Sequence, residues 1–160
     1  MIREFSASGD IDAVVNVLKS SYLTQGPEVP KFEKEVSQKV GCKYAVAVNS
    51  GTSALHLACM ALGIGKGDTI WTSPNTFVAS ANCGLYCGAE IDFVDICPIT
   101  RNLSIQELEK KLDKAKKINK LPKVIIAVHF AGLPTEQEKI FKLSCRYGFK
   151  IIEDASHSLG

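Results

Sequence analysis

The sequence predicts an α/β fold of three layers, in which helices cover both faces of a mainly parallel sheet. Helical and strand-like hydrophobic patterns alternate along the chain with short loops, the order that parallel sheets with helical crossovers require. The run Val124–Val128 is apolar throughout, as a strand buried on both faces should be. With 46% hydrophobic and 22% charged residues, the 160-residue chain can bury a core and is too apolar to be disordered.

The first part of the chain predicts two helices followed by a strand. The first helix follows Asp10, a favourable N-cap residue. Its hydrophobic residues have helical i, i+3, i+4, i+7 spacing: Ile11, Val14, Val15 and Leu18. Ser21–Pro27 is a loop by composition, and a second helix is expected between Pro30 and Gly41. A strand is expected at Tyr44–Val48.

The middle of the chain predicts two helices and two strands. The apolar positions of the first of these helices end at Gly63 and have helical spacing: Leu55, Ala58, Cys59 and Leu62. Strands are expected at Thr69–Thr72 and Ile91–Val94, with a helix at Thr76–Tyr86 between them.

The last part of the chain predicts two helices that begin with capping boxes. Ser104–Glu107 and Thr135–Glu138 each place Glu three residues after Ser or Thr. The second of these helices is expected to end at Gly148. A final strand, Phe149–Ile152, then leads into two acidic residues.

Composition narrows the class of protein. The Lys-rich stretch from Lys110 to Lys123 is interpreted as a solvated helix face and loop rather than a binding patch, and the net charge is only +2. No nucleic-acid partner is therefore expected. Cys83 and Cys87 could share a helix face but have no further ligands at metal spacing, so no metal is expected. With no signal peptide and no apolar run of ~20 residues, the sequence predicts a reduced, cytoplasmic protein without a membrane partner.

Candidate ligand-binding residues follow the predicted strands, because ligands of such folds bind beyond the carboxyl ends of the strands. Gly51 and Thr52 open a helix directly after the first strand. The free N–H groups and positive dipole of a helix N-terminus suit a phosphate. The same segment could instead be a plain helix cap that uses Ser50 or Thr52.

Three further candidates lie after the later strands. Phe77 is either a core aromatic, which its periodicity favours, or a flat surface for a ring. Asp154 is costly to bury without a partner, which could be a protonated ring nitrogen, an ion pair or a helix N-terminus. His157 could bind a ligand hydroxyl or be a satisfied, half-buried histidine. Together, a phosphate seat, an aromatic plate and a carboxylate suit a planar phosphorylated heterocycle such as pyridoxal 5'-phosphate (PLP).

The sequence resembles the DegT/DnrJ/EryC1/StrS family of PLP-dependent nucleotide-sugar aminotransferases of fold type I. The matching segments follow the family's order along nearly the whole chain: Leu23–Pro27, Phe32–Glu33, Asn49–His56, Pro74–Ser80, Val128–Gly132 and Ile152–Gly160. Within the family, Leu23–Gly26 and Asp154–Gly160 are most similar to the subgroup that aminates a UDP-linked 4-keto-6-deoxy sugar on the pseudaminic acid route.

The resemblance implies a role for each candidate. Gly51 and Thr52 would bind the cofactor phosphate, and Phe77 would stack on its ring. Asp154 would pair with the ring nitrogen, and His157 would contact the phenolic oxygen side.

A separate segment, Thr24, Gln25 and Gly26, would lie near the entrance for the sugar nucleotide. The family transfers an amino group from glutamate to a nucleotide-linked keto sugar, and its members are expected to be homodimers.

The resemblance also implies a domain division and a lysine that lies outside the 160 residues. Residues 1–30 would be an N-terminal helix and substrate loop, and residues 31–160 the N-terminal part of the PLP-binding large domain, incomplete at its C-terminal side. The lysine that holds the cofactor is expected beyond Gly160, because Lys150 and Lys66 do not fit the role. The 160 residues alone are thus expected to be inactive.

Two alternatives stay open at this point. The chain could belong to a PLP-dependent sugar dehydratase, whose relatives have histidine in place of that lysine, or be a non-catalytic binding or regulatory remnant. A nicotinamide-binding fold is a weaker alternative, because Ser50–Thr52 is not a Gly-x-Gly-x-x-Gly motif.

Overall fold

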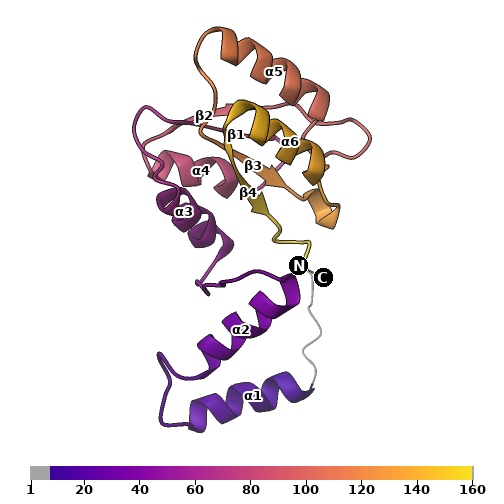
Figure 1. Ribbon diagram of the computed structural model, residues 1–160. Helices are drawn as coiled ribbons and strands as arrows, with labels where there is room; N and C mark the ends of the chain where they lie inside the picture. The colour runs from indigo at the N-terminus through magenta and orange to yellow at the C-terminus, as the bar shows by residue number, and fades with distance from the viewer. Residues whose placement is uncertain (1–7, 160) are drawn as a thin grey trace. The chain divides into compact units, whose positions relative to one another are not determined.

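The computed structural model describes residues 8–159 and contains a parallel sheet of four strands (Figure 1). The strands lie in the order β2-β1-β3-β4. Their bounds are Thr69–Thr72 for β1, Glu90–Phe93 for β2, Val124–Val128 for β3 and Lys150–Asp154 for β4. These four strands confirm the predicted parallel sheet. The central strand β3 is buried except at its last residue, as its uninterrupted apolar sequence predicts.

Helices cover both faces of this sheet (Figure 1). One face packs against α3 (Gly51–Ala61) and α4 (Ala79–Tyr86). The other face packs against α5 (Ile105–Lys117) and α6 (Gln137–Tyr147). The fold is therefore a three-layer αβα arrangement, which confirms the predicted fold class.

Alternate side chains of the strands enter two separate cores. Ile70, Val124 and Ile126 pack with α3 and α4, whereas Trp71 and Ile125 pack with α5 and α6. This follows from the two-residue repeat of a strand, which sends successive side chains to opposite faces. Two buried side chains of the first core are the thiols of Cys59 and Cys83, which pack there as small hydrophobic groups.

The chain divides into two compact units between Ala47 and Val48. The first unit holds α1 (Ser8–Lys19) and α2 (Glu28–Val40), and the second holds the sheet and its helices. Helix α2 begins before Pro30, since proline is tolerated in a first helical turn, where N–H groups have no intrahelical acceptor. The predicted domain boundary after residue 30 differs from this division and stays a prediction.

Several sequence predictions about local structure are wrong. Asp10 is not the N-cap of the first helix, because α1 begins at Ser8 and Asp10 lies within its first turn. Tyr44–Val48 is not a strand, because no described strand pairs with it, and Tyr44 and Val46 are largely exposed. Thr135 does not cap α6: the helix follows Glu136, which makes no side-chain cap bond. Instead the backbone N–H of Thr135 donates to Nδ1 of His129 (3.1 Å).

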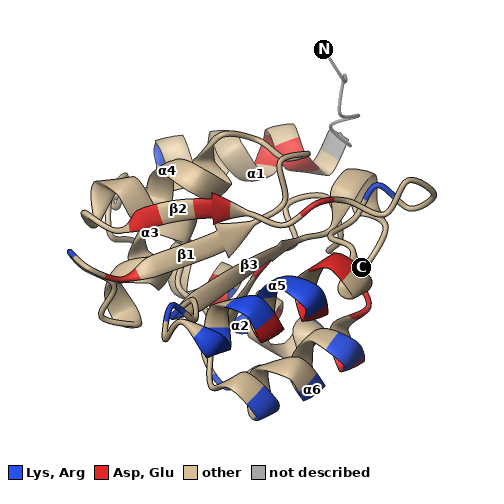
Figure 2. Cartoon of the chain, turned by 90° about the horizontal axis from the view of Figure 1, so that it is seen from above, with Lys and Arg blue, Asp and Glu red and all other residues tan. Residues whose placement is uncertain are grey.

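The Lys-rich stretch is a solvated surface, as predicted. Lysines line the outer face of α5 in Figure 2, and Lys114, Lys116 and Lys117 crowd its last turn, where they complement the helix dipole. Three of the remaining lysines, Lys110, Lys111 and Lys123, form ion pairs with carboxylates.

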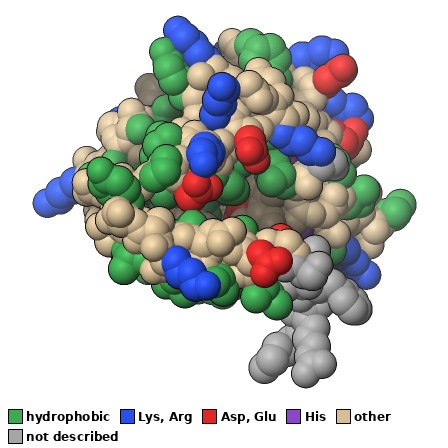
Figure 3. Space-filling view, turned by 90° about the horizontal axis from the view of Figure 1, so that it is seen from below, with side chains coloured by type: hydrophobic (Ala, Val, Ile, Leu, Met, Phe, Trp, Pro, Cys, Tyr) green, Lys and Arg blue, Asp and Glu red, His purple; other side chains and the backbone are tan. Residues whose placement is uncertain are grey.

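Residues 8–159 also have features that bear on membrane spanning, disulfide bonding and metal binding. None of the helices there has both the length and the apolar character to span a membrane. The cysteines there are free thiols, and no cluster of three or more potential metal ligands is present there. Hydrophobic side chains reach the surface at separate places among charged ones (Figure 3).

Candidate functional site

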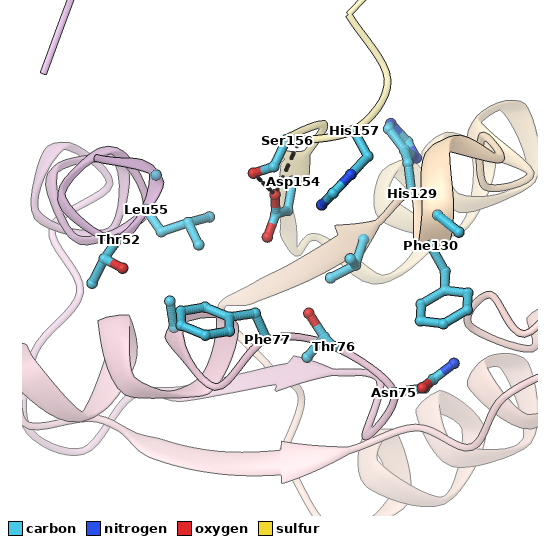
Figure 4. Close-up of a pocket in the computed structure, with 14 residues that line it drawn as sticks. Thr52, Leu55, Asn75, Thr76, Phe77, His129, Phe130, Asp154, Ser156 and His157 are labelled. Carbon is cyan, nitrogen blue, oxygen red and sulfur yellow. Dashed lines mark hydrogen bonds between the residues drawn. The ribbon is translucent and has the colours of Figure 1, made fainter. Parts of the chain in front are cut away.

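A cavity of about 550 Å³ lies at the carboxyl end of the sheet. Its volume is within the usual range for a small-molecule or cofactor site. Four segments form its walls: the start of α3, the loop between β1 and α4, the end of β3 and the end of β4 (Figure 4). The lining residues are Gly51, Thr52, Leu55, Asn75, Thr76, Phe77, Ala79, Val128, His129, Phe130, Ala131, Asp154, Ser156 and His157.

The N-terminus of α3 contributes backbone donors to the cavity. Ser50 caps the helix, and its Oγ accepts from the N–H of Ser53 at 3.2 Å. The N–H groups of Gly51 and Thr52 precede the first intrahelical bond, so the helix itself provides no acceptor for them. Ser50 is therefore a helix cap, as one of the two interpretations predicts. Binding of a phosphate by the N–H groups of Gly51 and Thr52 is compatible with this cap and stays a prediction.

Phe77 lies at the cavity and not in the core. Its side chain precedes α4 and is 72% exposed, so the core interpretation that its periodicity favoured is wrong. Helix α4 begins only at Ala79, later than predicted, so the helical spacing does not extend to Phe77. Figure 4 shows its ring below Asp154, facing the space between α3 and the end of β3. An aromatic face in this position offers a flat apolar surface to a ligand ring.

Asp154 ends β4 and is held by three donors. Its Oδ1 accepts from the backbone N–H of Ser156 at 3.3 Å and from the hydroxyl of Ser156 at 2.6 Å. Its Oδ2 accepts from the hydroxyl of Ser80 on α4 at 3.2 Å. An ionised carboxylate has about four acceptor positions, so these bonds orient the group and still leave it able to accept from a ligand. Figure 4 shows the carboxylate directed into the cavity.

The opposite wall is formed by the loop after β3. His129 is buried; its Nδ1 accepts from the N–H of Thr135, and its Nε2 lies 3.4 Å from Oε2 of Glu153. The backbone N–H of His129 donates to the carbonyl of Asp154 at 3.1 Å. His129 thus joins β3 to β4 at the edge of the cavity.

A tight turn continues this wall. Ala131 and Gly132 both have positive φ, of 51° and 87°. A Cβ atom on Gly132 would lie 2.9 Å from the carbonyl oxygen of His157, so the close approach of these two segments requires glycine. The side chain of His157 itself is exposed, which rules out the half-buried alternative.

Asn102 was not singled out from the sequence, yet it fixes the position of Phe130. Its Oδ1 accepts from the N–H of Phe130 at 2.9 Å, while its Nδ2 donates to the carbonyls of Leu133 (2.9 Å) and Pro134 (3.2 Å). A buried amide that satisfies all these groups holds the loop in one conformation. The sequence gives little signal for it, because Asn102 lies far along the chain from the loop that it binds.

The structure brings five of the sequence-predicted residues to one cavity: Gly51, Thr52, Phe77, Asp154 and His157. Their roles toward a cofactor stay predictions. Thr24, Gln25 and Gly26 belong to the first unit, whose placement relative to the cavity is not determined, so their proximity to a substrate stays a prediction as well. No lysine is among the described residues that line the cavity.

The chain is similar to known proteins over nearly all of its length. Residues 6–160 match the model of the DegT/DnrJ/EryC1/StrS aminotransferase family. EpsN of Bacillus subtilis, provisionally named a pyridoxal phosphate-dependent aminotransferase, is 44% identical over 135 residues, which cover 84% of this chain and 35% of EpsN.

Two solved structures show the same fold. A DegT DnrJ EryC1 StrS aminotransferase from Brucella abortus is 35% identical, with a TM-score of 0.87 over 92% of this chain and 40% of its own. PseC of Helicobacter pylori, an aminotransferase involved in the biosynthesis of pseudoaminic acid, is 34% identical, with a TM-score of 0.87 over 98% of this chain and 41% of its own. The chain thus spans about two fifths of the length of these relatives.

Proposed function

The chain belongs to the DegT/DnrJ/EryC1/StrS aminotransferase family, and we propose that it supplies the PLP-binding wall of an enzyme that transfers an amino group from glutamate to a keto group of a nucleotide-linked deoxy sugar. The observation that carries this proposal is the cavity itself. Helix N–H groups, an exposed aromatic ring and an oriented carboxylate surround one space, although they come from distant parts of the chain.

The residues present fit PLP in chemical type. The phosphate would be bound by the N–H groups of Gly51 and Thr52, where the positive end of the α3 dipole favours an anion. The pyridine ring would lie against Phe77. His157 is exposed at the rim, where its imidazole would reach the phenolic oxygen side of the ring.

Asp154 would hold a proton on the ring nitrogen. A carboxylate beside a basic nitrogen favours its charged, protonated form, and the bonds from Ser80 and Ser156 keep the carboxylate in place. When bound, PLP supplies an electron-withdrawing ring that stabilises negative charge developing on the substrate carbon. The protein's own contribution is to orient that ring and to keep its nitrogen protonated.

The proposal requires a lysine to hold the cofactor and move a proton, and the described cavity residues do not supply one. We therefore propose that the 160 residues alone bind PLP without covalent attachment and do not transaminate. The homodimer, the cytoplasmic location and the UDP-linked 4-keto-6-deoxy sugar of the pseudaminic acid route remain part of this proposal. The similarity to PseC supports the choice of sugar.

Binding of pyridoxine 5'-phosphate by the chain tests the proposal. This probe keeps the ring nitrogen and the phosphate but has no aldehyde to react with surface lysines. Isothermal titration calorimetry should show one site. Asp154→Asn should weaken binding ~10- to 150-fold, the equivalent of the ~1.5–3 kcal/mol that a hydrogen bond to a charged group contributes.

Asp92→Asn is the matched control. Asp92 is an exposed aspartate of β2, at the opposite edge of the sheet from β4, paired with Lys111 and outside the cavity lining. This variant should bind as the unaltered chain does. Absence of binding to the unaltered chain, or equal binding by both variants, would contradict the proposal. Amino-sugar formation by the 160 residues with PLP and glutamate would contradict the predicted inactivity.

A further inference from the structure

A shallow groove of about 460 Å³ adjoins the cavity described above. Its lining residues are Pro74, Asn75, Ile96, Arg101 and Phe130. Asn75 and Phe130 also line the cavity, so the two spaces share a wall. Figure 4 shows the side chains of Asn75 and Phe130 at the same end of the cavity, away from Thr52 and Leu55. A ligand that fills the cavity can therefore extend into the groove.

The groove carries a guanidinium group without an anionic partner. Arg101 is exposed, and none of the ion pairs among residues 8–159 involves it. The acidic residue of the same loop, Asp95, uses Oδ1 to accept from the N–H of Ile96 at 2.7 Å. A free guanidinium beside a ligand cavity is suited to a carboxylate or a phosphate, which it binds through two parallel hydrogen bonds.

The backbone holds Arg101 in an uncommon conformation. Its φ is +63°, in the left-handed region that residues with a side chain seldom adopt. Hydrogen bonds enforce this turn: the N–H of Arg101 donates to the carbonyl of Cys97, and the N–H of Cys97 donates to the carbonyl of Asn102, both at 2.8 Å. Strain of this kind persists where the surrounding structure fixes it, and it is concentrated at binding sites.

The three loops that form the groove are also tied to one another. Nδ2 of Asn75 donates to the carbonyl of Arg101 at 3.4 Å. Asn102, the next residue, accepts from the N–H of Phe130 and donates to the carbonyl of Leu133. The groove is therefore preorganised, and binding does not have to order its walls.

We propose that this groove is a subsite for the anionic group of a substrate, with Arg101 as its principal ligand. The inference rests on the proposed function, because it assumes that the neighbouring cavity holds the cofactor ring. The shared chemistry is an anionic oxygen group, which has two sources in that reaction: a carboxylate of the amino donor or the diphosphate of the sugar nucleotide. Phe130 would provide the apolar side of the subsite.

The test titrates the chain, saturated with pyridoxine 5'-phosphate, with L-glutamate in one arm and uridine 5'-diphosphate in the other. One of the two should bind and thereby identify the source of the anionic group. Arg101→Gln should weaken that probe ~10- to 100-fold, the loss expected for a charge-assisted bidentate pair. Arg101→Lys should recover part of the affinity, because it restores the charge without the planar fork.

The variants isolate the guanidinium from other effects. Glutamine and lysine both have a side chain with a Cβ, so each meets the same backbone strain at residue 101 as arginine does. Arg146→Gln is the control, since Arg146 is an exposed arginine of α6 that pairs with Glu109 and lines neither space. It should leave both arms unchanged.

The outcomes separate this inference from the proposed function. Failure of the unaltered chain to bind pyridoxine 5'-phosphate contradicts the proposed function. Two other outcomes contradict only the subsite. In one, the unaltered chain binds pyridoxine 5'-phosphate normally but binds neither L-glutamate nor uridine 5'-diphosphate. In the other, the Arg101→Gln variant binds the anionic probe as tightly as the unaltered chain does. In the expected result, Arg101→Gln still binds pyridoxine 5'-phosphate normally but loses the anionic probe.

Discussion

Replacing Gly132 with alanine tests whether the turn after β3 supports the segment that carries His157. The change adds one methyl group at a position with φ +87°. A side chain in this left-handed region costs ~1–2 kcal/mol. The new Cβ would also lie 2.9 Å from the carbonyl oxygen of His157, closer than van der Waals contact allows. Overpacking of this kind adds ~1–3 kcal/mol. We expect the free energy of unfolding to fall by ~2–5 kcal/mol.

Gly148→Ala separates the two contributions. Gly148 has nearly the same φ, +85°, but no atom lies within 4 Å of its added Cβ. It should lose only the ~1–2 kcal/mol of backbone strain. Urea unfolding, followed by fluorescence of the single, buried tryptophan, Trp71, measures both variants. With an m-value of ~2 kcal/mol per M, their midpoints should differ by ~0.5–1.5 M.

Binding gives a second readout of the same change. If the segment around His157 yields to the new methyl group, the difference in stability shrinks, but the wall of the cavity moves. Gly132→Ala should then bind pyridoxine 5'-phosphate more weakly than Gly148→Ala. Equal stability and equal binding in the two variants would refute the reasoning.

Two further predictions concern pH. The Lys123 ammonium and the N–H of Gly65, both bonded to Asp68, hold the pKa of that carboxyl below its usual value. The resulting stabilisation is at most ~1 kcal/mol for such a surface pair. It is present above pH ~4 and is lost as the pH falls through the lowered pKa of Asp68. The urea midpoint of the Asp68→Asn variant should therefore approach that of the unaltered chain in acid. The hydroxyl of Tyr147 donates to Asp113 at 2.7 Å, which raises the pKa of Tyr147. Tyr147→Phe should cost ~0.5–1.5 kcal/mol at neutral pH, and this difference should disappear as the pH rises through the raised pKa; a difference that persists in strong alkali would contradict this account.

The order of strands and helices could be predicted because each hydrophobic pattern reports on burial. Val124–Val128 has to be buried on both faces, and the structure shows it so. The helix beginning at Ile105 is also where the sequence places it, because Ser104 caps it by accepting from the N–H of Glu107. These elements depend on local sequence, so local reasoning suffices for them.

The wrong predictions depended on partners that lie outside the predicted element. Tyr44–Val48 has the apolar composition of a strand, but a strand forms only beside another strand, and the sequence does not say which one. Thr135 has the spacing of a capping box, yet its backbone N–H donates to Nδ1 of His129. The turn of the loop after β3 brings these two residues together.

The candidate site was predictable only in part for the same reason. Gly51, Phe77 and Asp154 could be found because each follows a strand, and strand ends meet at one edge of a parallel sheet. The groups that hold them in place could not. Ser80 reaches Asp154 across 74 positions of sequence, and nothing local in the sequence links the two.

That bond has a consequence for the timing of folding. One side of the cavity comes from residues 51–77 and the other from residues 128–157. During synthesis the first side emerges from the ribosome long before the second, and no ligand can bridge them until β4 has paired with β3. Slow closure of such distant contacts is typical of parallel sheets. A ligand of this cavity would therefore recognise only chains in which β4 has paired with β3, and by mass action it would favour them over partly folded ones.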